Sequence, residues 1–297
     1  MEMYSKRLFH RIKLLGVKKT IGSALGRFIS EKKILFAFIV NKNGLEIGGP
    51  SPSCFQHKAL PIYSSVNSID NVDFSRTTLW NKTSHNKDEF HYGNRVGKQF
   101  IMEASDLKII PDEKYDFVVS SHLIEHLSNP IKAIFEMKRV VKVGGIVIFV
   151  APHKETTFDH NRKITTLQHM VGDFAKNILE GDTSHLDIEE IVQDYDFLLD
   201  LGISGKEEFI ARTKENTQNR ALHQHVFVTD TLLQLIDYCS LKIILVRPRL
   251  SYGILVVSQK LSADKESEAR QSNQNFLSTD SKWRSSSPFL TDKTHAV

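Results

Sequence analysis

The sequence predicts an α/β fold in which a doubly wound, mostly parallel sheet carries a helical insertion after its fifth strand. Three observations support this fold class. Short apolar stretches alternate with helical ones from about residue 36 to 260, and the connections between them are short. The stretch 115–120 (YDFVVS) is a continuous apolar strand of the kind that is buried on both faces. Such strand–helix–strand alternation is typical of parallel sheets covered by helices.

Seven segments have the apolar composition expected of strands. In chain order they are 44–48, 66–69 with Asp70 at its end, 100–102, 115–120, 146–150, 242–246 and 253–258. A helix is expected between the fourth and fifth strands, because Asn129 can cap it and Pro130 suits its first position. Gly144 and Gly145 end that helix, and the last two segments are expected to pair and close the sheet.

Three other regions flank or interrupt this domain, which we place at 36–260. Residues 1–35 are rich in Lys and Arg, with apolar residues at roughly helical spacing, and predict a basic helical segment. We favour a solvated helix that caps the domain, while contact with anionic lipid stays open. Residues 153–222 are more polar and are interpreted as a helical insertion that forms a lid over the substrate. Residues 261–297 are rich in Ser, Asp, Lys, Asn and Gln and are predicted to be disordered.

The composition is that of an ordinary globular protein. Of 297 residues, 40% are hydrophobic and 25% are charged, and a net charge of +4 is only mildly basic, so we expect no specific nucleic-acid partner. The two cysteines, Cys54 and Cys239, exclude a disulfide framework or a cysteine-rich zinc site. No apolar run reaches the roughly eighteen residues of a spanning helix, and no signal peptide is recognisable. We therefore expect a cytoplasmic protein, with membrane association through the basic N-terminus as the open alternative.

A glycine turn follows the first expected strand, in the segment Leu45–Ser51 (LEIGGPS). Glycine lets the backbone approach a ligand because it has no Cβ. The dinucleotide fingerprint needs a third glycine, which this turn lacks. A carboxylate at Glu46 would repel a pyrophosphate and attract an amino group, which favours S-adenosylmethionine over NAD. Asp70, about twenty residues further on, stands where a nucleotide site places its ribose-binding carboxylate, with Asp73 as a rival.

Further motifs follow the turn in order: 102–107 (MEASDL), 115–127 (YDFVVSSHLIEHL) and Gly144-Gly145. Together they resemble the type 11 group of class I S-adenosylmethionine-dependent methyltransferases, over roughly residues 43–155. That group shares a Glu-x-Gly turn, an acidic strand end, an acid-Ala-x-x-Leu segment, a Tyr/Phe-Asp-x-Val strand and a Leu-x-Glu-His continuation. The resemblance implies a Rossmann-like fold and S-adenosylmethionine as cofactor. Pro50 departs from the pattern, because a second loop glycine is more usual there and proline lacks a backbone N–H.

The resemblance also implies roles for individual residues. In chain order these are Glu46, Gly48 and Gly49 for the methionine part of the cofactor, Asp70 for the ribose hydroxyls, Glu103 and Ala104 for the adenine, and Ser120, Ser121 and His122 for the sulfonium and the acceptor.

Histidine is abundant, with thirteen residues, and several follow expected strands. Methyl transfer mainly requires that donor and acceptor are held aligned. If the acceptor is a hydroxyl, a base that removes its proton adds rate, and histidine is the commonest choice. We predict His153 or His160 as this base, with His122 next. Asp159 could orient a neighbouring histidine, and Arg162 could bind an anionic acceptor such as a uronic acid or a phosphate.

A metal centre is a further alternative, because the histidines with Asp159 and Asp173 include acceptable ligand types. No compact His-Glu-x-x-His spacing occurs, so we predict no metal. The preferred function is O-methylation of a small-molecule or saccharide acceptor, since the resemblance suggests relatives from polysaccharide or lipopolysaccharide gene sets. A nicotinamide-dependent enzyme on a similar sheet, and a non-catalytic binding module with the same fold, remain as alternatives. The oligomeric state stays open.

Overall fold

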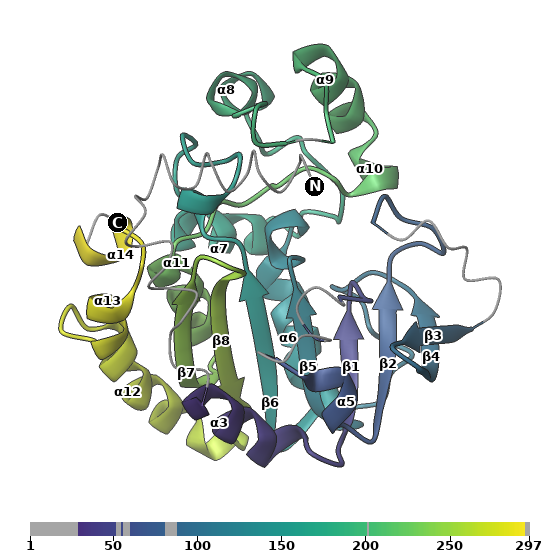
Figure 1. Ribbon diagram of the computed structural model, residues 1–297, viewed down its shortest axis with the longest axis vertical. Helices are drawn as coiled ribbons and strands as arrows, with labels where there is room; N and C mark the ends of the chain where they lie inside the picture. The colour runs from purple at the N-terminus through teal and green to yellow at the C-terminus, as the bar shows by residue number, and fades with distance from the viewer. Residues whose placement is uncertain (1–28, 52–54, 56–59, 81–87, 201, 295–297) are drawn as a thin grey trace.

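The computed structural model describes residues 29–51, 55, 60–80, 88–200 and 202–294 (Figure 1). The predicted N-terminal segment therefore lies largely outside the described residues. The strands are β1 (Asn43–Ile47), β2 (Ser68–Asp73), β3 (Glu89–Tyr92), β4 (Arg95–Ile101), β5 (Tyr115–Ser121), β6 (Val141–Ala151), β7 (Lys242–Arg249) and β8 (Gly253–Gln259). The α-helices are α3 (Ile29–Ile39), α5 (Ile62–Ser65), α6 (Pro130–Val140), α7 (Leu167–Ala175), α8 (Ile188–Asp194), α9 (Lys206–Lys214), α10 (Asn216–Asn219), α11 (Thr229–Tyr238), α12 (Glu266–Leu277), α13 (Lys282–Ser286) and α14 (Thr291–Thr294). Short 3-10 helices are η1 (Ile124–His126), η2 (Lys154–Thr156) and η3 (Ala263–Lys265).

The strands form one sheet in the order β3-β4-β2-β1-β5-β6-β8-β7. The five strands from β4 to β6 in this order run parallel, whereas β8 is antiparallel to both of its neighbours. The predicted doubly wound, mostly parallel sheet is confirmed. The chain moves outward from β1 to one side and then returns to β5 on the other, so the strand order reverses between β1 and β5. Ligands of such sheets bind beyond the carboxyl ends of the strands at this switch point.

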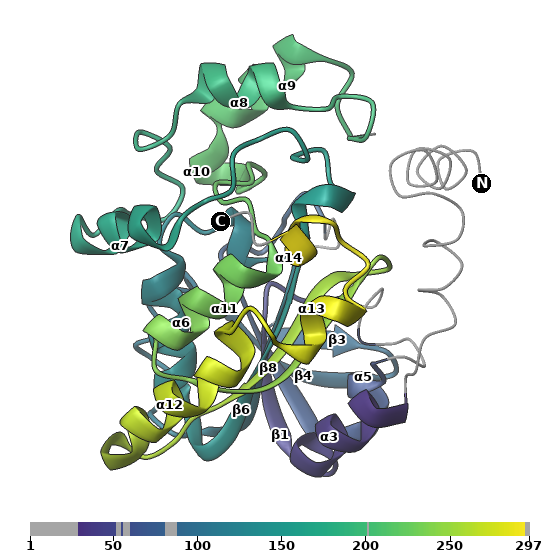
Figure 2. The ribbon, with the colours of Figure 1, turned by 90° about the vertical axis from the view of Figure 1, so that its left-hand side faces the viewer.

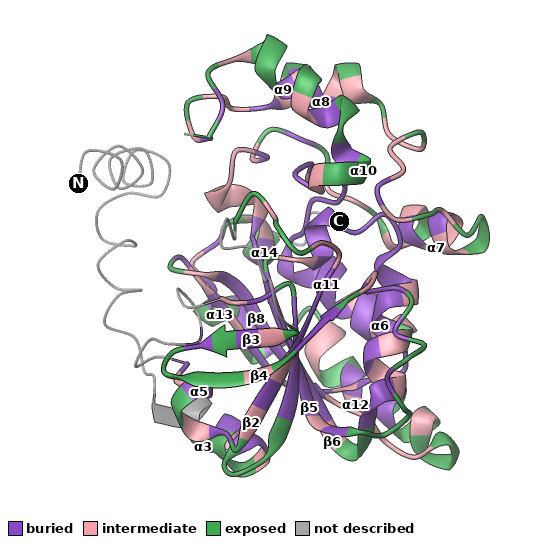
Figure 3. Cartoon of the chain, turned by 90° about the vertical axis from the view of Figure 1, so that its right-hand side faces the viewer, coloured by how far each residue is buried: buried purple, intermediate pink, exposed green. Residues whose placement is uncertain are grey.

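Helices cover both faces of the sheet, as Figure 2 shows, and its central strands are mostly buried (Figure 3). One core lies on the side of α6, α7, α11 and α12, and includes Val118 and Val147. The other lies on the side of α3 and α5, and includes Phe117 and Val119. Successive residues of β5 thus point to opposite cores, which is why its sequence is apolar without alternation. Helix α3 contributes Leu35 and Ile39 to the second core, and therefore crosses the boundary we placed after residue 35.

Two details of the sheet differ from the prediction. Strand β2 begins at Ser68 and ends at Asp73, about three residues later than expected, because polar residues break its apolar pattern. Strands β3 and β4 form an antiparallel hairpin in which Tyr92 pairs with Arg95 around a two-residue loop, and β3 was not predicted. Gly93 in that loop has φ +57, a left-handed conformation that glycine adopts readily.

The insertion after β6 carries α8, α9 and α10 above the carboxyl edge of the sheet (Figure 1). It has a small core of its own, to which Ile191, Tyr195 and Phe209 belong. Helix α7 instead packs against α6 and α11 of the main domain. None of the described helices is both long and apolar enough to cross a membrane.

The prediction of a disordered tail at 261–297 is wrong for most of that segment, because η3, α12, α13 and α14 pack along the main domain (Figure 2). Asn273 on α12 is fully buried, and its side chain accepts from the N–H of Ile243 at 2.7 Å and donates to the carbonyl of Leu241 at 2.9 Å. Arg284 forms a buried ion pair with Asp230 on α11. The tail is polar because its polar side chains serve as buried hydrogen-bond partners, and composition alone does not distinguish this use from solvation.

Candidate functional site

A side chain of β2, that of Asn71, holds the turn after β1 in place. Asn71 is fully buried, its Oδ1 accepts from the N–H of Gly49 at 3.0 Å, and its Nδ2 faces the Gly49 carbonyl at 3.3 Å. A Cβ at Gly49 would lie 2.4 Å from the carboxyl carbon of Glu46. Gly48 has φ +81. Both glycines are therefore required by the turn itself, which presents bare backbone at the switch point.

Glu46 lies directly beneath this turn and is fully buried. The Tyr63 hydroxyl donates to its Oε2 at 2.8 Å, while Oε1 has no partner of ordinary hydrogen-bond geometry among the described residues, although Ser51 is near. Burial raises the pKa of Glu46 to about 7, against the opposing hydrogen bonds from Tyr63 and Ser51. An unsatisfied buried carboxylate oxygen at this position suits a ligand that brings a cationic donor.

The acidic strand end is Asp73 and not Asp70. Because β2 ends later than predicted, Asp70 pairs in register with Leu45 inside the sheet, away from the carboxyl edge. Its carboxylate accepts from the Tyr115 hydroxyl at 2.7 Å and from the N–H of Lys98 at 2.9 Å. Asp70 therefore lies away from the edge where we expected it, and its role in ribose binding stays an untested prediction. Its rival Asp73 stands at the edge and is buried, and burial together with the charge of Glu103 raises its pKa to about 7.

The segment after β4 carries Glu103 and Ala104 beside Asp73. Ala104 is buried, and Glu103 is partly exposed. Arg220, at the end of α10, donates to Glu103 at 2.5 Å and lies 5.3 Å above the ring centroid of Phe74. The insertion thus contacts the carboxyl edge of the sheet through Arg220 and Glu103, and its role as a lid stays a prediction.

The end of β5 forms the other wall of the switch point. Ser120 and Ser121 are buried, and the Ser121 hydroxyl lies 3.2 Å from Nδ1 of His122. His122 is exposed, its backbone N–H donates to the Val150 carbonyl at 2.7 Å, and its φ of +51 is unusual for a residue with a side chain. Its predicted place at the end of the fourth parallel strand is where the structure has it.

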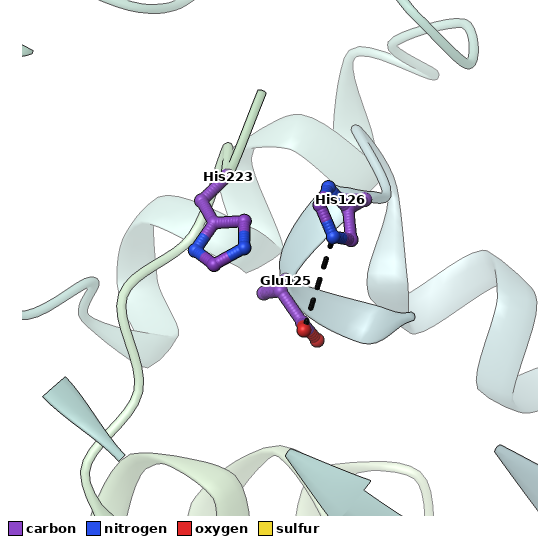
Figure 4. A group of neighbouring side chains, drawn as sticks. All are labelled: Glu125, His126 and His223. Atoms are coloured by element: carbon purple, nitrogen blue, oxygen red, sulfur yellow. Dashed lines mark ion pairs between the residues drawn. The ribbon is translucent and has the colours of Figure 1, made fainter. Parts of the chain in front are cut away.

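A buried group of titratable side chains follows immediately, and Figure 4 shows its three central members. Glu125 and His126 come from η1, and His223 comes from the segment before α11. Each offers a possible ligand atom within 4.8 Å of the other two, and the Glu125 Oε1 to His126 Nε2 distance is 3.9 Å. Both carboxylate oxygens of Glu125 lack a hydrogen-bond partner among the described residues. These three residues have the donor types to hold a divalent metal as well as to move a proton.

His223 is oriented by a second carboxylate. Asp159 accepts from Nδ1 of His223 at 2.6 Å and from Arg162 at 2.7 Å, and Arg162 also donates to the His223 carbonyl. Burial alone would raise the pKa of Asp159, but the charges of His223 and Arg162 outweigh it and lower that pKa to about 2. Burial raises the pKa of Glu125 to about 7. The site therefore pairs a firmly ionised carboxylate with one that is half protonated near neutral pH.

The structure places the two favoured bases elsewhere. His153 is fully buried under the C-terminal tail, stacked on Phe289 with ring centroids 3.6 Å apart. Its Nδ1 accepts from the N–H of Glu155 and its Nε2 faces Asp292, both at 3.3 Å, so both nitrogens are occupied. This arrangement argues against a catalytic His153, whose role stays an untested prediction. His160 lies in the insertion, partly exposed, with Nε2 2.9 Å from Asp196, and its catalytic role stays a prediction.

Comparison with known proteins finds similarity to methyltransferases over part of the chain. Residues 52–149 match the model of the type 11 methyltransferase domain. The chain is 27% identical to malonyl-[acyl-carrier protein] O-methyltransferase 2 of Ilyobacter polytropus over 152 residues, 51% of this chain and 52% of that protein. It is 33% identical to phosphatidylethanolamine N-methyltransferase of Cereibacter sphaeroides over 92 residues, 31% of this chain and 44% of that protein. Residues 52–149 are therefore similar to a methyltransferase domain.

The chain spans about half the length of the curated relatives it matches. Among solved structures, an S-adenosylmethionine-dependent methyltransferase from Mesorhizobium loti superposes with a TM-score of 0.44 at 10% identity, over 80% of this chain and all of that one.

S-adenosylmethionine is the cofactor expected of this methyltransferase domain, and the residues present fit it. The turn at Gly48 and Gly49 is bare backbone, the carboxyl of Glu46 packs directly against Gly49, and Oε1 of that carboxyl lacks a partner of ordinary hydrogen-bond geometry among the described residues. Asp73 adds a buried carboxylate at the next strand end.

Several residues of the candidate site were not predicted from the sequence. Asn71 and Tyr63 were missed because their partners lie on other elements, and Glu125 was noted only as part of a motif. The expectation that Asp159 orients a neighbouring histidine was the available signal, and the structure identifies that neighbour as His223.

Proposed function

We propose that this protein is an S-adenosylmethionine-dependent O-methyltransferase in which His223 takes the proton of the acceptor hydroxyl. The observation that carries the proposal is the Asp159–His223 contact of 2.6 Å, beside the exposed His122 at the end of β5. A carboxylate on Nδ1 fixes the tautomer of a histidine and leaves Nε2 free to accept a proton. Arg162 holds Asp159 in turn, so the base has a defined orientation.

The residues on each side of the switch point have separate tasks in this proposal. Glu46, Gly49 and Asp73 bind the cofactor, which supplies an electrophilic methyl group on a sulfonium. Nε2 of His223 would take the hydroxyl proton of the acceptor, whose oxygen would gain the methyl group as the carbon–sulfur bond breaks and the cofactor leaves as a thioether. Asp159 stabilises the resulting imidazolium, because its carboxylate stays ionised with a pKa of about 2.

The acceptor class follows from the need for a base. An amine acceptor can react in its neutral form, whereas a hydroxyl must lose a proton, so a positioned histidine favours O-methylation. Within hydroxyl acceptors we retain a sugar, in accordance with the resemblance to enzymes of polysaccharide gene sets. Malonyl-[acyl-carrier protein] and phosphatidylethanolamine, on which the relatives act by name, are the competing acceptors.

The test has a binding step and a transfer step. Calorimetric titration with S-adenosylmethionine, S-adenosylhomocysteine and NAD should give saturable binding of the two sulfur compounds and none of NAD. Binding of NAD alone would reject the methyltransferase proposal, and binding of none would favour the non-catalytic module. Transfer of labelled methyl is then measured to sugar hydroxyls, a malonyl thioester and phosphatidylethanolamine.

The role of His223 is tested by His223→Gln against the matched variant His160→Gln. Loss of a general base lowers kcat about 10²–10⁴-fold, and the affinity for S-adenosylhomocysteine should stay as in the wild type. His160→Gln should retain turnover, because Asp196 engages its Nε2. If His160→Gln is the variant that loses turnover, the base lies in the insertion and the assignment of His223 fails.

A further inference from the structure

A second group of imidazole and carboxylate side chains lies outside the proposed reaction site. His169 and Asp173 stand four residues apart on α7, His185 lies in the loop before α8, and His225 precedes α11. His169, Asp173 and His185 each offer a ligand atom within 4.8 Å of the other two. The His225 ring centroid lies 5.8 Å from that of His169 and 6.3 Å from that of His185. Three possible ligand atoms thus lie close together, and the ring of His225 lies beside them.

The polar atoms of this group lack the partners that buried groups normally have. His225 is 1% exposed, yet neither ring nitrogen has a hydrogen-bond partner of ordinary geometry among the described residues. The same holds for both ring nitrogens of His185 and for Oδ2 of Asp173, which lies 3.2 Å from Nε2 of His169. The backbone of Ser128 approaches the ring of His225 outside ordinary geometry. Such buried groups are costly unless something binds them.

We propose that His169, Asp173, His185 and His225 bind one divalent zinc-type cation. Three imidazoles and one carboxylate are ligands that Zn²⁺ accepts, and four protein ligands are typical of a structural site. Bonds of about 2.0–2.1 Å in a tetrahedron place ligand atoms roughly 3.4 Å apart. The His169–Asp173 pair, at 3.2 Å, already meets this separation, and the side chains of His185 and His225 would have to move closer for all four to bind the ion.

The surroundings allow a cation to enter. His169, Asp173 and His185 line a surface depression of about 400 Å³, together with Thr166, Gln168, Gly172 and Lys176. His169 is 38% exposed in its side chain, whereas Asp173 is buried beneath it. Lys176 is a competing positive charge, but it is exposed and can turn into solvent.

The proposed ion would help to hold the residues of the reaction site in position. The backbone N–H groups of Gln224 and His225 both donate to the carbonyl of Glu125, at 2.7 and 3.1 Å. His223 is two residues from His225 and belongs to the same segment. An ion that joins α7, the loop of His185 and this segment would therefore hold His223 and Glu125 in register.

The experiment measures zinc binding to the full chain without an affinity tag of histidines. Protein stripped with a chelator is titrated with Zn²⁺ against a chromophoric competitor, and thermal unfolding is followed with and without the ion. The wild type should bind about one Zn²⁺ per chain and unfold at a higher temperature when it is bound. His169→Gln should weaken binding at least ~100-fold, since loss of an outer-shell partner alone costs about 10–100-fold. That position is partly exposed, so the variant keeps its fold.

Two controls keep the result interpretable. His91→Gln removes an exposed histidine of β3 and should leave zinc binding unchanged. His223→Gln removes a ligand type from the group around Glu125, and it should also leave the stoichiometry unchanged. If His223→Gln abolishes binding while His169→Gln and His185→Gln retain it, the ion belongs to the reaction site and the proposal is overturned. Equal weak binding by the wild type and by His169→Gln overturns it as well. Neither readout depends on methyl transfer, so this proposal and the proposed function fail separately.

Discussion

Removal of the Asp292 carboxylate should destabilise the whole protein, although it lies in a tail of polar composition. Asp292 is 1% exposed and accepts from the hydroxyls of Ser287 and Thr229 at 2.6 and 2.8 Å, and from Nε2 of His153 at 3.3 Å. Asp292→Ala leaves these three buried donors without their acceptor. At ~1 kcal/mol for each lost hydrogen bond, the free energy of unfolding should fall by about 3 kcal/mol. For a chain of this size that corresponds to a decrease in Tm of about 6–12 °C.

Thermal unfolding followed by circular dichroism measures this effect, with Asp280→Ala as the matched control. Asp280 lies in the same tail but is exposed, so its replacement should change Tm by about 1 °C or less. Burial alone would raise the pKa of Asp292, but the hydrogen bonds from His153, Ser287 and Thr229 lower it. A lowered pKa stabilises the fold above the unfolded value of about 4 and loses that effect as the pH falls. The difference between the wild type and Asp292→Ala should therefore shrink below about pH 4. Equal Tm values for Asp292→Ala and Asp280→Ala at pH 7 would refute the packing of the tail.

Three further predictions concern the cofactor side of the site. Asp73→Asn should weaken S-adenosylmethionine binding about 10–100-fold, the equivalent of a hydrogen bond to a charged group, whereas Asp70→Asn should leave the affinity unchanged. If calorimetry shows weaker binding for Asp70→Asn and not for Asp73→Asn, Asp70 is the ribose-binding residue. Because burial holds the pKa of Asp73 near 7, wild-type affinity should fall as the pH drops below 7, and Asp73→Asn should show a flatter profile. Gly49→Ala should abolish S-adenosylmethionine binding with the fold retained, since its Cβ would meet Glu46. Gly172→Ala, with open space around the new Cβ, should bind the cofactor normally. Normal binding by Gly49→Ala would show that the turn can shift.

Local sequence carried most of the information about the sheet. The strand at 115–120 and the helix begun by Asn129 and Pro130 are present as β5 and α6, because burial on both faces and helix capping act over a few residues. The glycine turn was located for the same reason, since the need for Gly48 and Gly49 is a property of the backbone at those positions. The order of these elements was enough to predict the fold class.

Contacts between residues far apart in the sequence could not be predicted in this way. Asp70 and Asp73 both suit an acidic strand end, and the register of β2 against β1 alone decides between them. His153 follows a strand and looked like a base, but a tail residue 139 positions away covers it. The polar composition of that tail was compatible with solvation, and only its hydrogen bonds to buried groups show otherwise.

The sequence by itself determined the α/β class, the turn that suits a cofactor and the set of histidines from which a base is drawn. The tertiary structure decided which histidine has a carboxylate beside it, which is enclosed, and which side chains gather beside α7. The reason is physical: strand and turn preferences are set by neighbouring residues, whereas burial, pKa and ligand geometry depend on atoms brought together from across the chain.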